Sequence, residues 1–243
     1  MIVQACINGA RDAAFHPALP VNPEAMARDS AACVAAGAAE VHLHARGPVG
    51  RESLSPSAVD AAVSAIRRTC PGTLFGVSTG AWIERDDERT LAAIDGWREL
   101  PDYASVNLSE AAAPAVIARL RQRGVGVEAG LASVADAERL AALKLGGLAL
   151  RMLIEVSEPD VGEALAVVDG IENVLNRAGV RRPMLVHGLD ATVWRFVALA
   201  AERRWSTRVG LEDGKALPNG ATAADNAALV AAAAGGFRTR DRR

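Results

Sequence analysis

The chain has 243 residues, a formal net charge of −2 and a hydrophobic fraction of 50%. This length fits either two small domains or one large α/β domain with a single core. The near-neutral charge, and the lack of a basic stripe interleaved with aromatic residues, argue against nucleic acid as a partner.

The cysteines and the first residues bear on the compartment. Cys6, Cys33 and Cys70 lie far apart and form no C-x-x-C pair, which argues against a disulfide framework and a structural zinc knuckle. The apolar opening at residues 1–7 has no positive leader and is too short for a signal sequence or a membrane span. We therefore expect a cytoplasmic protein that does not enter the membrane.

Short β-like apolar runs alternate eight times with longer, Ala-rich amphipathic stretches. In chain order, the predicted strands are residues 2–8, 40–44, 74–78, 103–107, 126–130, 147–153, 184–187 and 207–211. The predicted helices that follow them are residues 23–37, 57–70, 86–97, 111–123, 133–145, 160–178, 191–203 and 222–234. Eight β/α units over about 240 residues predict one TIM-barrel domain spanning residues 1–243. A doubly wound open sheet is the alternative, but no G-x-G-x-x-G follows the first strand.

Barrel topology predicts where a site would lie, because catalytic groups of such barrels gather where strands end and the following loops begin. Polar side chains occur at these predicted strand ends: Asn8 and Arg11, His42 and His44, Ser78, Asn107, Glu128, Arg151, His187, and Arg208 with Glu212 and Asp213. We expect His16, in the first loop, to be exposed to solvent.

His42 and His44 are two residues apart in a β-like run, so a strand would place both imidazoles on one face. Zinc or a similar divalent ion accepts imidazole and carboxylate ligands, and a catalytic site usually keeps three protein ligands and an open position. Glu212 is the preferred third ligand, because strand 8 closes the barrel next to strand 1, and His187 is the alternative. The competing interpretation is a pair of core histidines bonded to the backbone.

Other polar groups at the predicted rim suggest roles in acid–base chemistry. Asp213 beside Arg208 is typical of a general base with a cation that orients it, although a rim salt bridge would have the same pattern. Glu128 is a candidate second acid or base, or a group that orients a ligand, and a capping or surface role is the alternative.

Two further segments are candidates for binding substrate. The hydroxyls and glycine N–H of Ser78, Thr79 and Gly80 suit a substrate carboxylate, and a helix cap or turn is the alternative. Asn107, at the end of the fourth strand, is a further candidate.

The motifs occur in a familiar order: Asn-Gly-Ala from Asn8, Val-His-Leu-His-Ala-Arg to Arg46, Ser-Thr-Gly from Ser78, Arg-Val-Gly-Leu-Glu-Asp to Asp213, and Asn226 in the final helix. This order resembles the β-keto acid cleavage enzymes, whose best-studied type cleaves 3-keto-5-aminohexanoate. The resemblance extends over essentially the whole chain, with specific motifs at the two ends and a looser match in the middle third.

The resemblance implies a zinc-dependent barrel enzyme that converts a β-keto acid and acetyl-CoA into acetoacetate and the CoA ester of the shortened acid. It implies His42, His44 and Glu212 as zinc ligands, Asp213 as the base for the C2 proton and Arg208 as its partner. Ser78 would hold the substrate carboxylate, and Glu128 matches an acidic residue of the family only loosely. The resemblance also implies a homo-oligomer, in particular a tetramer.

Arg11 departs from the pattern of the aminohexanoate-cleaving members, which carry an acidic residue there to meet an ammonium group. We therefore predict a substrate tail without positive charge, such as the second carboxylate of a 3-oxo diacid like 3-oxoadipate, which a guanidinium can bind through two hydrogen bonds. The alternative is that Arg11 points to solvent or to the phosphates of CoA.

Two rival functions differ in class from this prediction. A metal-dependent hydrolase of the amidohydrolase type would carry H-x-H on strand 1 and further metal ligands on the middle strands, whereas this chain has the pair on strand 2. A catalytically inactive barrel used for binding is the other rival, and the set of polar groups at the rim argues against it.

Overall fold

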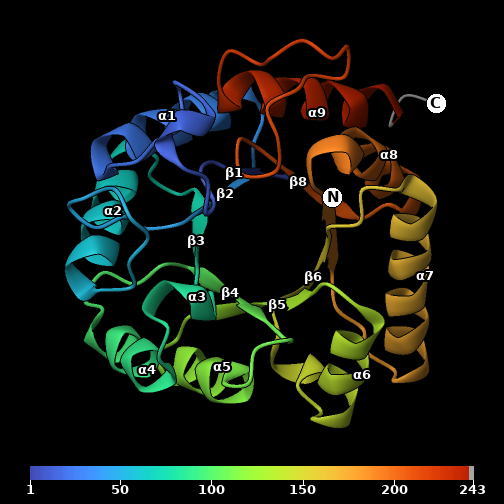
Figure 1. Cartoon of the computed structure of the whole chain (residues 1–243), viewed down its shortest axis with the longest axis horizontal. Coiled ribbons are helices and arrows are strands. Elements are labelled where there is room, and N and C mark those ends of the chain that lie inside the picture. The colour runs from blue at the N-terminus through green and yellow to red at the C-terminus, as the bar shows by residue number, and fades with distance from the viewer. Residues whose placement is uncertain (241–243) are drawn as a thin grey trace.

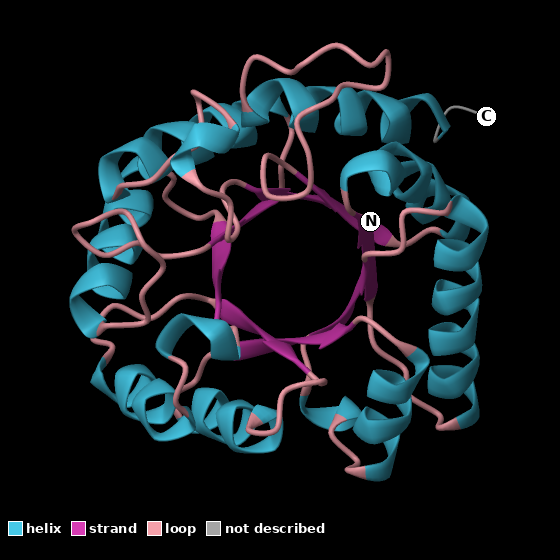
Figure 2. Cartoon of the chain, in the orientation of Figure 1, coloured by secondary structure: helices cyan, strands magenta, loops and turns pink. Residues whose placement is uncertain are grey.

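A closed ring of eight parallel strands forms the centre of the molecule, with helices around it, as the TIM-barrel prediction requires (Figures 1 and 2). The computed structural model describes residues 1–240, and side chains through residue 237. The strands are β1 (Val3–Cys6), β2 (Glu40–Leu43), β3 (Leu74–Ser78), β4 (Tyr103–Asn107), β5 (Gly126–Leu131), β6 (Arg151–Val156), β7 (Met184–Gly188) and β8 (Ser206–Val209). The ring closes where β8 pairs with β1, with Arg208 opposite Gln4.

The α-helices are α1 (Pro23–Ala36), α2 (Pro56–Thr69), α3 (Ala81–Glu84), α4 (Asp87–Gly96), α5 (Ala113–Gln122), α6 (Val134–Ala142), α7 (Val161–Arg177), α8 (Val193–Arg203) and α9 (Asn226–Arg240). Short 3₁₀ turns occur at Ala13–Phe15, Gly146–Leu148 and Asp190–Thr192. The short helix α3 was not predicted from the sequence.

Local signals set the helix ends. The Asn22 side chain accepts a hydrogen bond from the Ala25 N–H at the start of α1, and Gly37 ends this helix in the left-handed conformation, with φ of 115°. In α6, Ser133 and Asp136 form a reciprocal capping box. The predicted start of the last helix at residue 222 was wrong, because residues 216 and 222 pair as an antiparallel bridge and α9 begins only afterwards.

Strand alternation separates the core from the interior of the barrel. Val41 and Leu43 of β2 are fully buried in the hydrophobic core, while His42 between them belongs to the opposite face, which lines the barrel interior. Alternate side chains of each strand therefore have different surroundings. One set packs against the helices, and the other lines the interior of the barrel and its mouth.

Two predicted strand ends were wrong, and the errors concern Glu128 and Arg151. Residues 146–148 form a 3₁₀ turn instead of the start of a strand, so β6 begins at Arg151 and runs to Val156. Glu128 pairs with Arg151 near the beginning of β5, not at its end. Both side chains therefore lie near the end of the barrel where strands start.

Glu128 is part of a buried polar cluster in that half of the barrel. It is fully buried, accepts a hydrogen bond from Gln4 Nε2 at 2.9 Å, and pairs with Arg151 Nε at 2.6 Å. Arg151 also pairs with Glu40 and lies over the ring of Tyr103, with 5.0 Å between the guanidinium carbon and the ring centroid. Glu128 consequently connects strands within the barrel interior and does not line the pocket described below.

The outer layer closes with α9, which packs between α1 and α8 and against β1 and β8 (Figure 1). The buried Asn226 at its start accepts a hydrogen bond from Leu211 N at 2.6 Å and donates to Ile7 O at 2.8 Å. Within the described residues, none of the helices is long and apolar enough to cross a membrane.

Candidate active site

A pocket of about 400 Å³ opens where the strands end. Polar side chains from seven strands or the loops after them form most of its wall: His42, His44, Ser78, Ser105, Asn107, Glu155, Asp190, Arg11, Arg208 and Glu212. The position agrees with the rule that barrel enzymes place their chemistry at this face.

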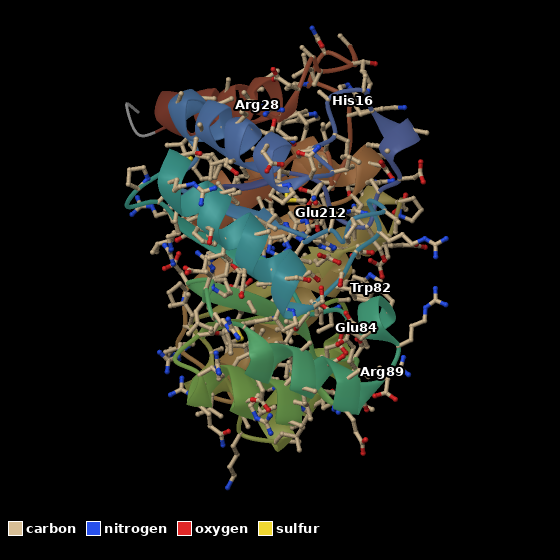
Figure 3. The ribbon with its side chains drawn as sticks, turned by 90° about the vertical axis from the view of Figure 1, so that its left-hand side faces the viewer. His16, Arg28, Trp82, Glu84, Arg89 and Glu212 are labelled. Atoms are coloured by element: carbon tan, nitrogen blue, oxygen red, sulfur yellow. The ribbon has the colours of Figure 1, made fainter. Side chains whose placement is uncertain are left out.

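His42, His44 and Glu212 come together at this pocket. Each offers one ligand atom, and these three atoms lie within 4.8 Å of one another. His42 Nε2 lies 3.9 Å from one Glu212 carboxylate oxygen, and His44 Nε2 lies 3.5 Å from the other. Figure 3 shows Glu212 within the barrel, on the side toward the loops that surround its mouth.

Buried charges control the protonation of this cluster. Burial, reinforced by the Arg208 guanidinium, lowers the pKa of His42 well below its usual value, which leaves the imidazole neutral. Burial would also lower the pKa of His44, but the carboxylates of Glu212 and Glu52 outweigh it and raise that pKa to about 9. Although burial alone would raise the pKa of Glu212, Arg208 and the two imidazoles hold it well below its usual value.

The donor set fits a divalent metal ion. Two imidazoles and one carboxylate are the ligands of many catalytic zinc sites, which leave a fourth position open. One oxygen of Glu212, Oε2, is buried and has no hydrogen-bond partner among the described residues. A buried, unpartnered carboxylate oxygen beside two imidazoles is a costly arrangement that a bound cation would relieve.

Glu52 is a part of the site that the sequence did not reveal. It lies in the loop after β2 and contacts the far nitrogen of His44, with 2.5 Å between His44 Nδ1 and Glu52 Oε1. The Trp82 indole N–H donates to the same carboxylate at 3.1 Å, and its ring stacks on His44 with 6.2 Å between centroids. Glu52 therefore fixes the orientation of His44 in the way that carboxylates often support metal-bound histidines.

Arg208 and Asp213, expected from the sequence to pair with each other, each form their ion pairs or hydrogen bonds with other residues. Arg208 is almost fully buried and forms its ion pairs with Glu212 and Glu155. Asp213 is fully buried outside the pocket wall and accepts hydrogen bonds from His187 Nδ1 at 3.0 Å and the Cys6 thiol at 2.7 Å.

His187, the alternative third ligand, lies instead between two carboxylates. Its Nδ1 contacts Asp213, and its Nε2 lies 3.1 Å from Glu155, which lines the pocket. Burial alone would lower the pKa of His187. The negative charge of Asp213, and to a smaller extent the contact with Glu155, outweigh burial and raise this pKa to about 9. The three groups form a continuous chain from the buried Asp213 to the pocket.

The Ser78-Thr79-Gly80 segment divides between pocket and scaffold. Ser78 and, from the next strand, Asn107 line the pocket, whereas the buried Thr79 hydroxyl donates to Ser105 O at 2.7 Å. Gly80 precedes α3, and its N–H donates to the Ser78 hydroxyl oxygen at 3.3 Å.

Arg11 lines the pocket, but much of its guanidinium is already engaged. Nε donates to Glu212 O at 3.0 Å, and one terminal nitrogen, Nη2, contacts Asp190 at 3.1 Å. The other terminal nitrogen, Nη1, has no hydrogen-bond partner within the part of the chain that the structure describes.

The prediction for His16 was wrong. This side chain is 5% exposed, and its ring bridges two backbone groups, Ala18 N at 3.1 Å and Ala223 O at 3.0 Å. It joins the first loop to the segment before α9, so it has a structural contact in place of solvent.

The chain resembles known proteins in sequence and in fold. A family model described as beta-keto acid cleavage enzyme matches residues 1–243. The 3-keto-5-aminohexanoate cleavage enzyme of Acetoanaerobium sticklandii is 32% identical over 95 residues, which cover 39% of this chain and 35% of that enzyme. The enzyme of the same name from Fusobacterium nucleatum is 33% identical over 92 residues, covering 37% and 34%. Each alignment thus spans about a third of the relative's length.

Solved structures of a protein named ObcA share the fold. Its ternary complex with a C4-CoA adduct and oxalate superposes with a TM-score of 0.76 at 17% identity, covering 93% of this chain and 65% of that one. Its binary complex with oxaloacetate gives a TM-score of 0.73 at 16% identity, covering 93% and 67%. These likenesses support the barrel, and the family match over all 243 residues shows that this chain belongs to the beta-keto acid cleavage enzyme family.

Proposed function

We propose that this protein uses acetyl-CoA to cleave a β-keto acid, giving acetoacetate and the CoA ester of the shortened acid. The observation that carries the proposal is the cluster of His42, His44 and Glu212 at a pocket that also holds Arg208 and Ser78. Family membership supplies the reaction class, and the ObcA complex with a CoA adduct supports a CoA-dependent route.

The three clustered side chains would hold a divalent ion, for which zinc is our candidate because imidazole and carboxylate ligands suit it. When bound, the ion would act as a Lewis acid on the substrate ketone and make its α-proton more acidic. Arg208 holds the Glu212 carboxylate in place, and Glu52 holds His44.

Asp213 is the proposed base for the proton at C2. The buried Cys6 thiol donates to Asp213 Oδ2, and burial, followed by the charge of Asp213, raises the pKa of this thiol, so it stays protonated. His187 connects Asp213 Oδ1 with Glu155 at the pocket wall. Because Asp213 lies behind the pocket wall, we propose that it receives the C2 proton indirectly, from Glu155 at the wall through the imidazole of His187.

Ser78 and Asn107 are the proposed contacts for the substrate carboxylate, because both line the pocket with groups that can donate hydrogen bonds. The free Nη1 of Arg11 is the proposed contact for the substrate tail. A guanidinium there disfavours an ammonium group and favours a second carboxylate, as in a 3-oxo diacid.

The test is an assay for acetoacetate with purified, zinc-loaded protein, acetyl-CoA and a panel of β-keto acids. We expect acetoacetate to form, with a 3-oxo diacid reacting faster than a substrate that carries a 5-amino group. The Glu212→Gln variant, prepared identically, controls for contaminating activity and should lose bound zinc and acetoacetate formation together. A zinc-loaded wild-type protein that forms no acetoacetate from any panel member would refute the proposal.

A further inference from the structure

A second cavity, of about 860 Å³, lies beside the active-site pocket. Its walls come from the loop after β1, the loop after β2 and the helix α3. Ala10, Arg11 and Trp82 belong to both cavities, so the second one continues the first across the rim. In Figure 3 the labelled Trp82, a residue of α3, lies on the same side of the molecule as the loops around the mouth. We call this second cavity the rim groove.

The rim groove carries an excess of positive charge. Four guanidinium groups line it, and two of them, Arg51 and Arg85, belong to exposed residues whose side chains have neither a hydrogen bond nor an ion pair within the described chain. A third, Arg46, keeps its Nε buried and unpartnered while its terminal nitrogens donate to backbone carbonyls.

Two carboxylates, those of Asp12 and Glu52, line the rim groove against four guanidiniums, and both already have partners within the described chain. Asp12 accepts a hydrogen bond from Ala14 N at 2.8 Å, and Glu52 is held by His44 and Trp82. Arginine presents a planar set of donors that matches phosphate oxygens, so unpaired guanidiniums in a groove favour a phosphorylated ligand.

We propose that the rim groove binds the phosphorylated nucleotide end of coenzyme A, with Arg51 and Arg85 as its phosphate contacts. This inference rests on the proposed function, in which the thioester must reach the pocket beside His42 and His44. The pantetheine arm would cross from groove to pocket at Arg11 and Trp82, the residues that the two cavities share. The exposed indole of Trp82 adds an apolar surface along that path.

Another basic cavity of the molecule cannot serve this purpose. It is lined by Lys144, Arg181 and Arg182 together with the residues that precede β6 and β7. These loops lie where strands begin, at the opposite end of the barrel from the pocket. A coenzyme bound there could not present its thioester to the clustered histidines.

The test compares coenzyme binding by the full-length protein and two double variants, using calorimetry at fixed ionic strength. Arg51→Gln/Arg85→Gln removes the two free guanidiniums of the groove. Arg28→Gln/Arg68→Gln makes the same charge change at two exposed arginines of α1 and α2 that also have no side-chain partner within the described residues and lie outside the groove. We expect the groove variant to bind CoA about tenfold or more weakly, the control variant to bind it like wild type, and pantetheine binding to be equal in all three.

Different outcomes separate the groove from the proposed function. Equal CoA affinity in all three proteins would refute the groove and leave the reaction intact. Loss of CoA binding in the groove variant alone, together with no acetoacetate from any β-keto acid, would refute the reaction and leave the groove. Binding of adenosine 3′,5′-bisphosphate to the wild-type protein tests whether the groove takes a free nucleotide instead. If this nucleotide bound as tightly as CoA does, the assignment to coenzyme A would be wrong.

Discussion

At the scale of single residues, the site depends on contacts that place Glu212 and His44. Gly9 has φ of +53°, and a Cβ there would lie 2.3 Å from Glu212 Cγ, so a glycine serves both the turn and the space for this carboxylate. Asn8 accepts a hydrogen bond from His44 N at 2.8 Å and donates to His44 O at 3.0 Å. These residues explain physically why an Asn-Gly pair follows β1.

At this scale we predict that the charge of Glu52 strengthens zinc binding through His44. Glu52→Gln keeps the size of the side chain but removes the charge that holds His44 Nδ1, so we expect zinc affinity to fall about 10- to 100-fold. Competition between the protein and a chelator of known affinity measures this change directly.

Trp82→Phe is the matched control, because it removes the indole N–H that both carboxylate oxygens of Glu52 accept and keeps an aromatic ring beside His44. It should change zinc affinity far less than Glu52→Gln. Unaltered zinc affinity in Glu52→Gln would show that Glu52 only braces the loop, and unfolding of the metal-free proteins would reveal any loss of stability.

At the scale of elements, periodicity predicted the eight β/α units, and barrel closure then favoured Glu212 over His187 as the partner of His42 and His44. Periodicity did not predict the ends of β6 correctly, because the strand begins and ends later than expected. The apolar run before Ser157 and Pro159 extends through Val156, and its inward positions are Arg151, Leu153 and Glu155. A predicted strand that extended to Val156 would have placed Glu155 at the mouth of the barrel and Arg151 at the opposite end.

Long-range contacts could not be predicted in the same way. Glu52 lies in the loop after β2, where it forms an isolated antiparallel bridge with Arg46, and nothing in its local sequence indicates that it meets His44. Asp213 follows Glu212 directly, yet the two carboxylates have different partners because consecutive residues after β8 turn in different directions. Such pairings depend on the closed barrel as a whole.

At this scale we predict that the hydrogen bonds of Asn226, which join α9 to the barrel, contribute to the stability of the fold. Asn226→Ala would leave the N–H of Leu211 and the carbonyl of Ile7 without their partner, both in a buried setting. We expect the free energy of unfolding to fall by about 2–3 kcal/mol, measured by chemical denaturation. Asn219→Ala, which removes a hydrogen bond within an exposed loop, should cost less than about 0.5 kcal/mol. Equal effects of the two substitutions would contradict this role for Asn226.

At the scale of the whole molecule, the barrel interior separates reaction from stability along its axis. The candidate metal ligands His42, His44 and Glu212 and the pocket lie at the end where the strands finish, and the polar cluster around Arg151 fills the end where they begin. Gly76 makes room for that cluster, because a Cβ on it would lie 2.0 Å from the Tyr103 ring. Such a division lets the loops at the mouth vary with the substrate while the opposite end holds the ring closed.

Arg151 carries the prediction that tests this division. Arg151→Met removes the guanidinium that pairs with both Glu40 and the fully buried Glu128, and leaves these two carboxylates without that cation. We expect a loss of about 3–5 kcal/mol in the free energy of unfolding, since an uncompensated buried charge is costly. Adding Glu128→Gln to Arg151→Met should recover part of the stability, while zinc affinity at the distant mouth stays the same in every variant that folds. A change in zinc affinity without a change in stability would show that the two ends of the barrel are coupled.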